Sequence, residues 1–510
     1  MKMRKCSILA GAAVLATMAM PAFAQTSIAI DRDAEIGTIE PEVYGQFLEH
    51  LGTQIYGGIW VGKDSAIPNT DGIRDDVFAA LQKLKVPVIR WPGGCYADLY
   101  HWRDGIGERT HRVNLAWGGT AEPNTFGTHE FFNLAERLGA KTYLNVNLGS
   151  GTVTEAADWL EYITGNGQTA LAQERRANGR AAPWKIDYLS IGNETWGCGG
   201  RMRPAYYADL YAHWASFMVV DGEKPVMIVA GAHDGNPEFS DEVLDHPMIG
   251  EVSKGISLHF YTLPTSDWSR KGAATGFPES EWAMTLERTL RMDGLIANSI
   301  AMIDRHEKLP DNYGLYVDEW GTWFDETEGR SSLWQENTIR DGVVAALNLN
   351  IFHKYADRVP MTNIAQMVNV LQAMILVDGD GMILTPTYHV YEMYVPFQNA
   401  QSLRVSLESP VYSNGATSIP ALSASAARMP DGRMVIALVN ADPRSAHDVE
   451  LPRLRGEEVS GRVLTGAAMD SRNSAASPDA VAPAPATIRQ ESDQFTAELP
   501  ARSVSVWIVG

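Results

Sequence analysis

The sequence has only three cysteines in 510 residues, Cys6, Cys95 and Cys198. Three cysteines cannot form the disulfide framework of a small secreted domain, and their spacing does not fit a zinc site. No cluster of His, Asp, Glu and Cys has ligand spacing either, so we predict no metal and no cofactor. The fold must then depend on a hydrophobic core, for which an apolar content of 45% is sufficient.

Basic residues are also scarce, since 42 Lys and Arg oppose 62 Asp and Glu, and the formal net charge is −20. This balance disfavours nucleic acid and anionic membranes, which attract positive charge. It is compatible with a neutral substrate such as a polysaccharide. Beyond the N-terminus, no stretch is long and apolar enough to cross a membrane.

Residues 1–24 have the pattern of a secretory signal peptide. Lys and Arg occupy three of the first five positions, a short apolar run follows over 7–20, and Ala22 and Ala24 fit a small-x-small cleavage site. The alternative is a membrane anchor, for which the run is short. We therefore expect a protein exported to the periplasm or beyond, with a net charge of −23 after cleavage.

The segment 42–387 alternates short apolar runs with helix-like or looped stretches. Such alternation over this length predicts an α/β fold of the TIM-barrel type, a (β/α)₈ catalytic domain. The eight strand candidates are 43–48, 86–91, 141–148, 186–192, 226–230, 256–260, 313–317 and 361–366.

The pattern of residues changes in the segment 388–510. Helical periodicity fades there, and short β-rich runs alternate with turn residues. This pattern predicts a C-terminal β-sandwich domain.

One predicted strand ends in Asn193-Glu194, with Trp196 just beyond. In a parallel α/β barrel, catalytic side chains gather at the carboxyl ends of the strands. We interpret Glu194 as a general acid/base and Asn193 as a hydrogen-bonding partner of a sugar hydroxyl. The alternative is a solvated loop glutamate with Asn193 in a turn.

A second strand end has the same form, with Asp318-Glu319 followed by Trp320 and Trp323. Glu319 is the candidate nucleophile, because a pair of carboxylates beside aromatic platforms is what glycoside hydrolysis requires. Strand alternation predicts that Asp318 points to the opposite side of the strand. The alternative is an exposed acidic pair.

Other strand ends add polar groups that would converge on the same mouth. Each alone could be a hydrogen-bonded core residue, but their convergence favours a site, and the two glycines of RWPGG allow close backbone approach. The candidates are Glu49, Arg90, His259, Tyr261 and Gln366.

Several motifs occur in an order that resembles glycoside hydrolase family 51, the α-L-arabinofuranosidases. They are YGQFLEH, RWPGG, LAW…NTFGTHEF, IGNE, SLHFY, DEWGTW, NIAQMVN and LTPTYHVYEMY, spanning about Tyr44 to Tyr394. The resemblance implies an acid/base after strand 4 and a nucleophile after strand 7, which are Glu194 and Glu319. It also implies that the segment 25–41 contributes a strand to the C-terminal sandwich.

The resemblance further implies how the sugar is held. Trp117 and Trp323 would form a wall of the pocket. The polar residues named above, together with Asn193, would bind or orient the sugar. Cys95 occupies the position after RWPGG where the better-known bacterial form has an Asn that contacts the sugar. A thiol cannot supply an amide, and the continuation TWGCGG after GNE is also unusual, so the aglycone preference stays open.

These features together predict a retaining, exo-acting α-L-arabinofuranosidase that releases side chains from arabinoxylan or arabinan. Its partner would be an arabinose-containing polysaccharide or oligosaccharide, with a homo-oligomer left open. A β-xylosidase, xylanase or endoglucanase on the same barrel is the first alternative. A non-catalytic carbohydrate-binding protein is the second, although it should have lost one of the two glutamates.

Cys95 follows the second strand and Cys198 follows the fourth. Both loops should lie at the same mouth and can lean over the third strand. An exported protein meets an oxidising compartment. We therefore consider two alternatives, a Cys95–Cys198 disulfide or two buried free thiols.

Overall fold

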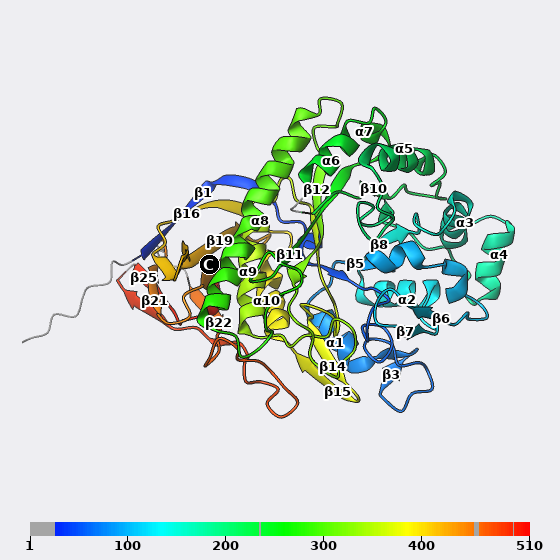
Figure 1. Ribbon diagram of the computed structural model, residues 1–510. Coiled ribbons are helices and arrows are strands. Elements are labelled where there is room, and N and C mark those ends of the chain that lie inside the picture. The colour runs from blue at the N-terminus through cyan, green and yellow to red at the C-terminus, as the bar shows by residue number, and fades with distance from the viewer. Residues whose placement is uncertain (1–25, 234–235, 453–457, 493) are drawn as a thin grey trace, which may run out of the picture.

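The computed structural model describes residues 26–233, 236–452, 458–492 and 494–510. The predicted signal peptide lies outside these residues. The chain forms a parallel barrel and a C-terminal, mostly strand domain, separated by a layer of helices (Figure 1). The predicted fold class of a TIM barrel followed by a β-rich domain is confirmed.

Eight parallel strands close the barrel, and each corresponds to one of the eight strand candidates. Their residues are apolar because both faces of a barrel strand are covered, by the interior packing and by the outer helices. In closed order the strands are β10 (Val226–Val229), β11 (Gly255–Thr262), β12 (Gly314–Thr322), β13 (Met361–Ile364), β2 (Gly45–Phe47), β5 (Val88–Trp91), β8 (Lys141–Val146) and β9 (Tyr188–Ile191).

Most of the helices lie in the stretches between the barrel strands. Several begin at a threonine whose hydroxyl accepts a backbone N–H of the first turn, as Thr152 does for α3 and Thr338 for α9. The helices are α1 (Asp75–Lys83), α2 (Thr128–Leu138), α3 (Val153–Thr164), α4 (Ala170–Ala177), α5 (Pro204–Ala215), α6 (Pro237–Leu244), α7 (Ile249–Val252), α8 (Glu279–Arg305), α9 (Ile339–Lys354) and α10 (Pro386–Tyr394).

Short elements lie in the connections between the longer helices and strands of both domains. The 3₁₀ turns are η1 (Pro41–Tyr44), η2 (Cys95–Leu99), η3 (Trp102–Gly105) and η4 (Val395–Phe397). The small hairpins are β3 (Asn69–Thr70) with β4 (Ile73–Arg74), β6 (Arg112–Asn114) with β7 (Thr120–Glu122), β14 (Ile375–Asp378) with β15 (Gly381–Leu384), and β17 (Val411–Asn414) with β18 (Thr417–Pro420).

Ten strands form the main sheet of the C-terminal domain in one hydrogen-bonded order. The sheet folds back on itself, so that β25 packs against β20 and β26, two strands to which it is not hydrogen-bonded. From one edge of the sheet to the other, the strands are β23 (Ala484–Pro485), β22 (Val459–Leu464), β26 (Ser503–Val509), β20 (Met434–Asn440), β19 (Leu422–Arg428), β16 (Gln401–Leu407), β1 (Thr26–Thr38), β21 (His447–Glu450), β25 (Gln494–Leu499) and β24 (Ile488–Glu491).

The first described strand, β1, belongs to this C-terminal sheet. It pairs antiparallel with β16, from Ile28 opposite Leu407 to Thr38 opposite Gln401, and parallel with β21. Figure 1 shows β1 beside β16, far from the barrel strands that follow it in the chain.

Helix α9 lies between the barrel and the C-terminal sheet and is buried from Ile339 to His353. It contacts α8, α10 and β12 on the barrel side and β19, β20 and β26 on the sheet side. His353 shows the connection, since its ring nitrogens lie 2.7 Å from the Tyr44 hydroxyl and 2.8 Å from Ser425 Oγ. Burial lowers the pKa of His353 to about 3, so it links the two domains as a neutral ring.

Every helix in the described part of the chain is too short or too polar to cross a bilayer.

Candidate active site

A pocket of about 240 Å³ opens at the carboxyl ends of the barrel strands. Of the predicted site residues, Arg90 and Asn193 lie beneath the floor, each 1% exposed, and the others line the pocket. The full lining is Glu49, Leu51, Cys95, Trp117, Glu194, Trp196, His233, His259, Tyr261, Trp268, Glu319, Trp323, Leu333, Gln366 and Leu371.

Glu319 is held by one hydrogen bond to each of its carboxylate oxygens. Arg90 Nη1 donates to Oε2 at 2.9 Å, and the Tyr261 hydroxyl donates to Oε1 at 2.8 Å. Gly94 makes room for this carboxylate, because a Cβ there would lie 3.0 Å from Oε2. The predicted need for glycines after Arg90 therefore has a steric cause.

Glu194 follows β9 and faces the same space. His259 Nδ1 lies 2.8 Å from Glu194 Oε1 and 3.5 Å from Glu319 Oε2. A carboxylate oxygen of Glu194 and one of Glu319 lie within 4.8 Å of each other. The backbone at Glu194 has a φ of 42°, an unusual conformation for a residue with a side chain, held here by the surrounding loop.

Asp318 corrects one prediction from the sequence. Strand alternation placed it opposite Glu319, yet its carboxylate lies in the barrel interior, 2.7 Å from the Tyr143 hydroxyl and 3.0 Å from His259 Nε2. The pairing of β12 with both neighbouring strands shifts register around this position, which is a β-bulge. A bulge breaks the two-residue alternation, so two successive side chains can point the same way.

The buried ionisable groups beneath the pocket stabilise one another's charges. Burial alone would lower the pKa of His259, but Glu319, Asp318 and Glu194 outweigh it and raise that pKa to about 10. Burial would raise the pKa of Asp318, but Arg90 and His259 together lower it. His259 is therefore an imidazolium that donates one N–H toward Glu194 and one toward Asp318.

Arg90 completes this charged floor. Burial opposes its charge, but Asp318 and Glu319 outweigh that effect and raise the pKa of Arg90 above its ordinary value. Its Nη2 donates to Asn193 Oδ1, which orients the side-chain amide of Asn193 beside Glu194. Sequence reasoning did not include Asp318 or Tyr143 in this network.

Glu49 follows β2 and lines the same pocket as Glu194 and Glu319. Its Oε1 accepts the Tyr96 backbone N–H at 3.0 Å, and its Oε2 accepts Gln366 Nε2 at 2.7 Å. Burial and the charge of Glu319 raise the pKa of Glu49 to about 7. Its carboxyl group can therefore either donate or accept near neutral pH.

Aromatic rings form one wall of the pocket. Trp117 and Trp323 are both half-buried, with centroids 6.4 Å apart, and Trp323 meets Tyr261 edge-on at 4.9 Å. Trp268, 53% exposed, meets Trp323 edge-on at 5.2 Å and extends the wall outward. Sequence reasoning missed Trp268, although it lies in the loop that follows β11.

The aromatic wall leads to a binding prediction. We expect Trp117→Ala and Trp323→Ala each to weaken arabinose binding about 10- to 100-fold, because each removes most of a ring face from the sugar. The melting temperature should fall by only a few degrees, since both rings are half-buried. Calorimetric titration and thermal unfolding of the same samples would measure both effects.

Trp323→Phe is the matched control, because it retains an aromatic face and should recover most of the affinity. A variant that folds poorly but binds arabinose unchanged would show that the ring is a core residue with no part in binding.

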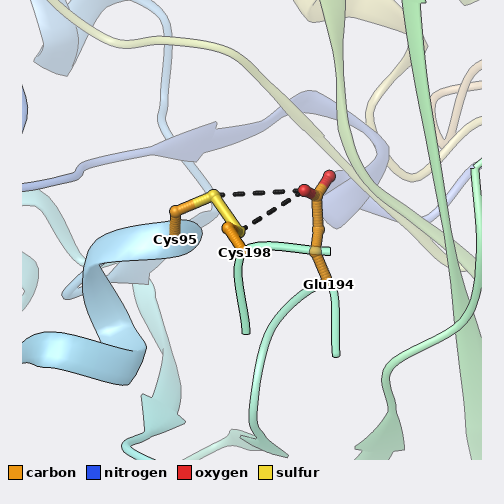
Figure 2. Close-up of side chains that lie close together, drawn as sticks. All are labelled: Cys95, Glu194 and Cys198. Carbon is orange, nitrogen blue, oxygen red and sulfur yellow. Dashed lines mark hydrogen bonds between the residues drawn. A yellow bond between two sulfur atoms is a disulfide. The ribbon is translucent and has the colours of Figure 1, made fainter. Parts of the chain in front are cut away.

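The structure joins Cys95 and Cys198 by a disulfide, with the Cα atoms 5.6 Å apart. Figure 2 shows both sulfur atoms facing the carboxylate of Glu194. The bonded sulfurs are not thiolates, so the group Cys95, Glu194 and Cys198 lacks the thiolate ligands that a zinc ion prefers.

Two glutamates that face one pocket at the mouth of a (β/α)₈ barrel, beside an aromatic wall, define a glycoside hydrolase. Comparison with known proteins specifies which kind. Residues 80–270 match the family model "Alpha-L-arabinofuranosidase 1 domain", and residues 318–503 match the model "Alpha-L-arabinofuranosidase C-terminal domain". The chain belongs to glycoside hydrolase family 51, the α-L-arabinofuranosidases, as its motifs predicted.

Individual relatives agree over nearly the whole chain. A Bacteroides ovatus protein named intracellular exo-alpha-L-arabinofuranosidase is 43% identical, over 98% of this chain and 99% of its own. The crystal structure of a family 51 arabinofuranosidase from Xanthomonas axonopodis pv. citri, also 43% identical, superposes with a TM-score of 0.91 over 95% of this chain and all of its own. An arabinose complex of the Thermotoga maritima enzyme is 32% identical, with a TM-score of 0.80 over 95% and 99%.

The prediction of export to the periplasm or beyond is wrong. The Bacteroides ovatus relative is named intracellular and aligns over 98% of this chain, which points to a protein that is not secreted. A short basic and then apolar N-terminus reports only charge and hydrophobicity, and these properties alone do not specify export. The net charge to consider is therefore −20 for the whole chain.

Proposed function

We propose that the protein is a retaining, exo-acting α-L-arabinofuranosidase, with Glu319 as nucleophile and Glu194 as acid/base. The observation that carries the proposal is the approach of the two carboxylates to within 4.8 Å. Retaining glycosidases hold their carboxyl groups about 5–5.5 Å apart, whereas inverting enzymes leave about 6.5–9.5 Å for a water molecule.

In the first step, Glu319 attacks the anomeric carbon of an arabinofuranosyl unit. Arg90 and Tyr261 each donate one hydrogen bond to a carboxylate oxygen of Glu319, and these two bonds orient it for attack. Glu194 gives its proton to the departing oxygen. The charge of His259 offsets the negative charge that then remains on Glu194.

In the second step, Glu194 accepts a proton from water, and the resulting hydroxide attacks the anomeric carbon of the glycosyl-enzyme ester. The bond to Glu319 breaks, and the carboxylate returns to Arg90 and Tyr261. Because two displacements occur on the same carbon, the released arabinose keeps the configuration of the substrate.

The exo mode is supported by a small pocket rather than a long groove, since a volume of about 240 Å³ suits a single terminal sugar. The proposed substrates are arabinose-containing polysaccharides and oligosaccharides, such as arabinoxylan and arabinan. We assign catalysis to the barrel domain, residues 42–387, and treat residues 388–510 with the N-terminal strand as its partner domain. A homo-oligomer remains a prediction.

The proposal is tested by product stereochemistry. We expect proton NMR during hydrolysis of 4-nitrophenyl α-L-arabinofuranoside to detect α-arabinofuranose first, with the β anomer rising only as the sugar equilibrates. The β anomer as the first product would refute double displacement.

A panel of 4-nitrophenyl glycosides separates the alternatives. We expect cleavage of the α-L-arabinofuranoside to exceed that of the β-D-xyloside and the β-D-cellobioside by orders of magnitude. Faster cleavage of the xyloside or cellobioside would instead favour a xylosidase or an endoglucanase.

A further inference from the structure

The disulfide Cys95–Cys198 lies directly against the proposed acid/base. Cys198 Sγ is 3.5 Å and Cys95 Sγ is 4.0 Å from Glu194 Oε2, and both contacts are drawn in Figure 2. Cys198 Sγ also lies 3.8 Å from Asn193 Nδ2. Both residues of the Asn-Glu pair therefore border the disulfide.

The disulfide also braces the loop that carries Glu194. Cys95 begins η2, and Asp98 in the same turn accepts the backbone N–H of Asn193 at 3.0 Å. Turn η2 thus holds the loop on both sides of Glu194, through Asp98 before it and through Cys198 after it. Because Glu194 has an unfavourable positive φ, its conformation depends on such support.

The oxidation state of the sulfurs changes what they can offer Glu194. Disulfide sulfurs carry no proton, so they can only accept a hydrogen bond, which a protonated Glu194 can donate. Two thiols can instead donate to the Glu194 carboxylate and favour its ionised form. The first step needs protonated Glu194, so the disulfide suits that step and the thiols oppose it.

We propose that the Cys95–Cys198 disulfide positions the acid/base Glu194, and that its reduction weakens the protonation-dependent first step. The inference rests on the proposed role of Glu194. The reductant is a small thiol or dithiol. Reducing compartments hold such reductants, and the name of the intracellular relative indicates a compartment of that kind.

The reduction balances as thiol–disulfide exchange. A thiolate attacks Sγ of Cys198, the more exposed of the two residues, and Cys95 leaves as a thiolate that takes a proton. A second thiolate then attacks the reductant's sulfur in the mixed disulfide and releases Cys198. The protein gains two electrons and two protons, and the reductant becomes its own disulfide.

The test compares oxidised and reduced enzyme in a Cys6→Ser background. Thiol counting of the denatured protein should then find no thiols in the oxidised enzyme and two in the reduced enzyme. Arabinosides whose leaving groups differ in pKa are the probes. Reduction should lower kcat/KM about tenfold for an unactivated arabino-oligosaccharide and hardly at all for an activated aryl arabinoside. The basic limb of the pH profile should move to lower pH, and reoxidation should reverse both changes.

Two double variants separate the brace from the hydrogen bonds, and neither should respond to reductant. Cys95→Ser with Cys198→Ser keeps donors beside Glu194 and should resemble the reduced enzyme. Cys95→Ala with Cys198→Ala loses the brace without adding donors, so its pH profile should stay closer to that of the oxidised enzyme.

A reduced enzyme with two counted thiols and an unchanged leaving-group dependence would overturn the inference. An equal loss of kcat/KM on all substrates together with a lowered melting temperature would also overturn it, because the disulfide would then act only on the stability of the fold. Failure of the proposed function itself would look different: the oxidised enzyme would cleave no arabinoside.

Discussion

Glu319→Ala is expected to reduce turnover of every arabinoside, activated or not, by on the order of 10⁴- to 10⁶-fold. The covalent intermediate needs this carboxylate, and the other glutamates of the pocket cannot replace it. Glu49 is committed to Tyr96 and Gln366, and Glu194 to His259. Steady-state kinetics with 4-nitrophenyl and oligosaccharide substrates would measure the loss.

The matched control is Glu326→Ala, which removes an exposed carboxylate from the segment after β12 and should leave turnover unchanged. Circular dichroism and thermal unfolding would verify that Glu319→Ala is folded. A folded variant that retains more than a few per cent of the wild-type rate would exclude Glu319 as nucleophile.

Glu194→Ala is expected to have an effect that depends on the leaving group. An unactivated oligosaccharide should lose about 10²- to 10⁴-fold in kcat/KM, because its departing oxygen needs a proton. A dinitrophenyl arabinoside should keep a fast first step and show a burst, since its second step then lacks a base. Stopped-flow measurement of phenol release would resolve the two steps.

Added azide gives a further readout for Glu194→Ala. Azide needs no base to attack the glycosyl-enzyme, so it should accelerate turnover and yield an arabinosyl azide of retained configuration. An equally slow first step on activated and unactivated substrates would rule out Glu194 as the acid/base.

Much of the fold and of the site's composition could be predicted from local sequence patterns. Barrel strands are short and apolar, and polar residues directly after them must reach the same mouth, which is why Glu194 and Gln366 could be placed from sequence. The structure brings the predicted residues together around one pocket. Their catalytic and binding roles remain predictions for the experiments above.

What could not be predicted depends on geometry that a linear pattern does not contain. Asp318 was assigned to the wrong side because a β-bulge is set by the pairing of β12 with both neighbours, and alternation assumes no bulge. Trp268 was missed because loop conformation decides whether a ring folds over the mouth or away from it. Export was predicted wrongly because hydrophobicity alone does not identify a signal.

The place of β1 in the C-terminal sheet has a consequence for the order in which the protein can be completed on the ribosome. Thr38 bonds to Gln401, which is 363 residues later in the chain. At about 5–20 residues per second, β1 waits roughly 20–70 s for β16 to be synthesised. β1 lies between β16 and β21, so a chain that lacks its N-terminal strand would leave these two strands without their shared neighbour. One of the earliest segments to be translated is therefore among the last to gain its partners.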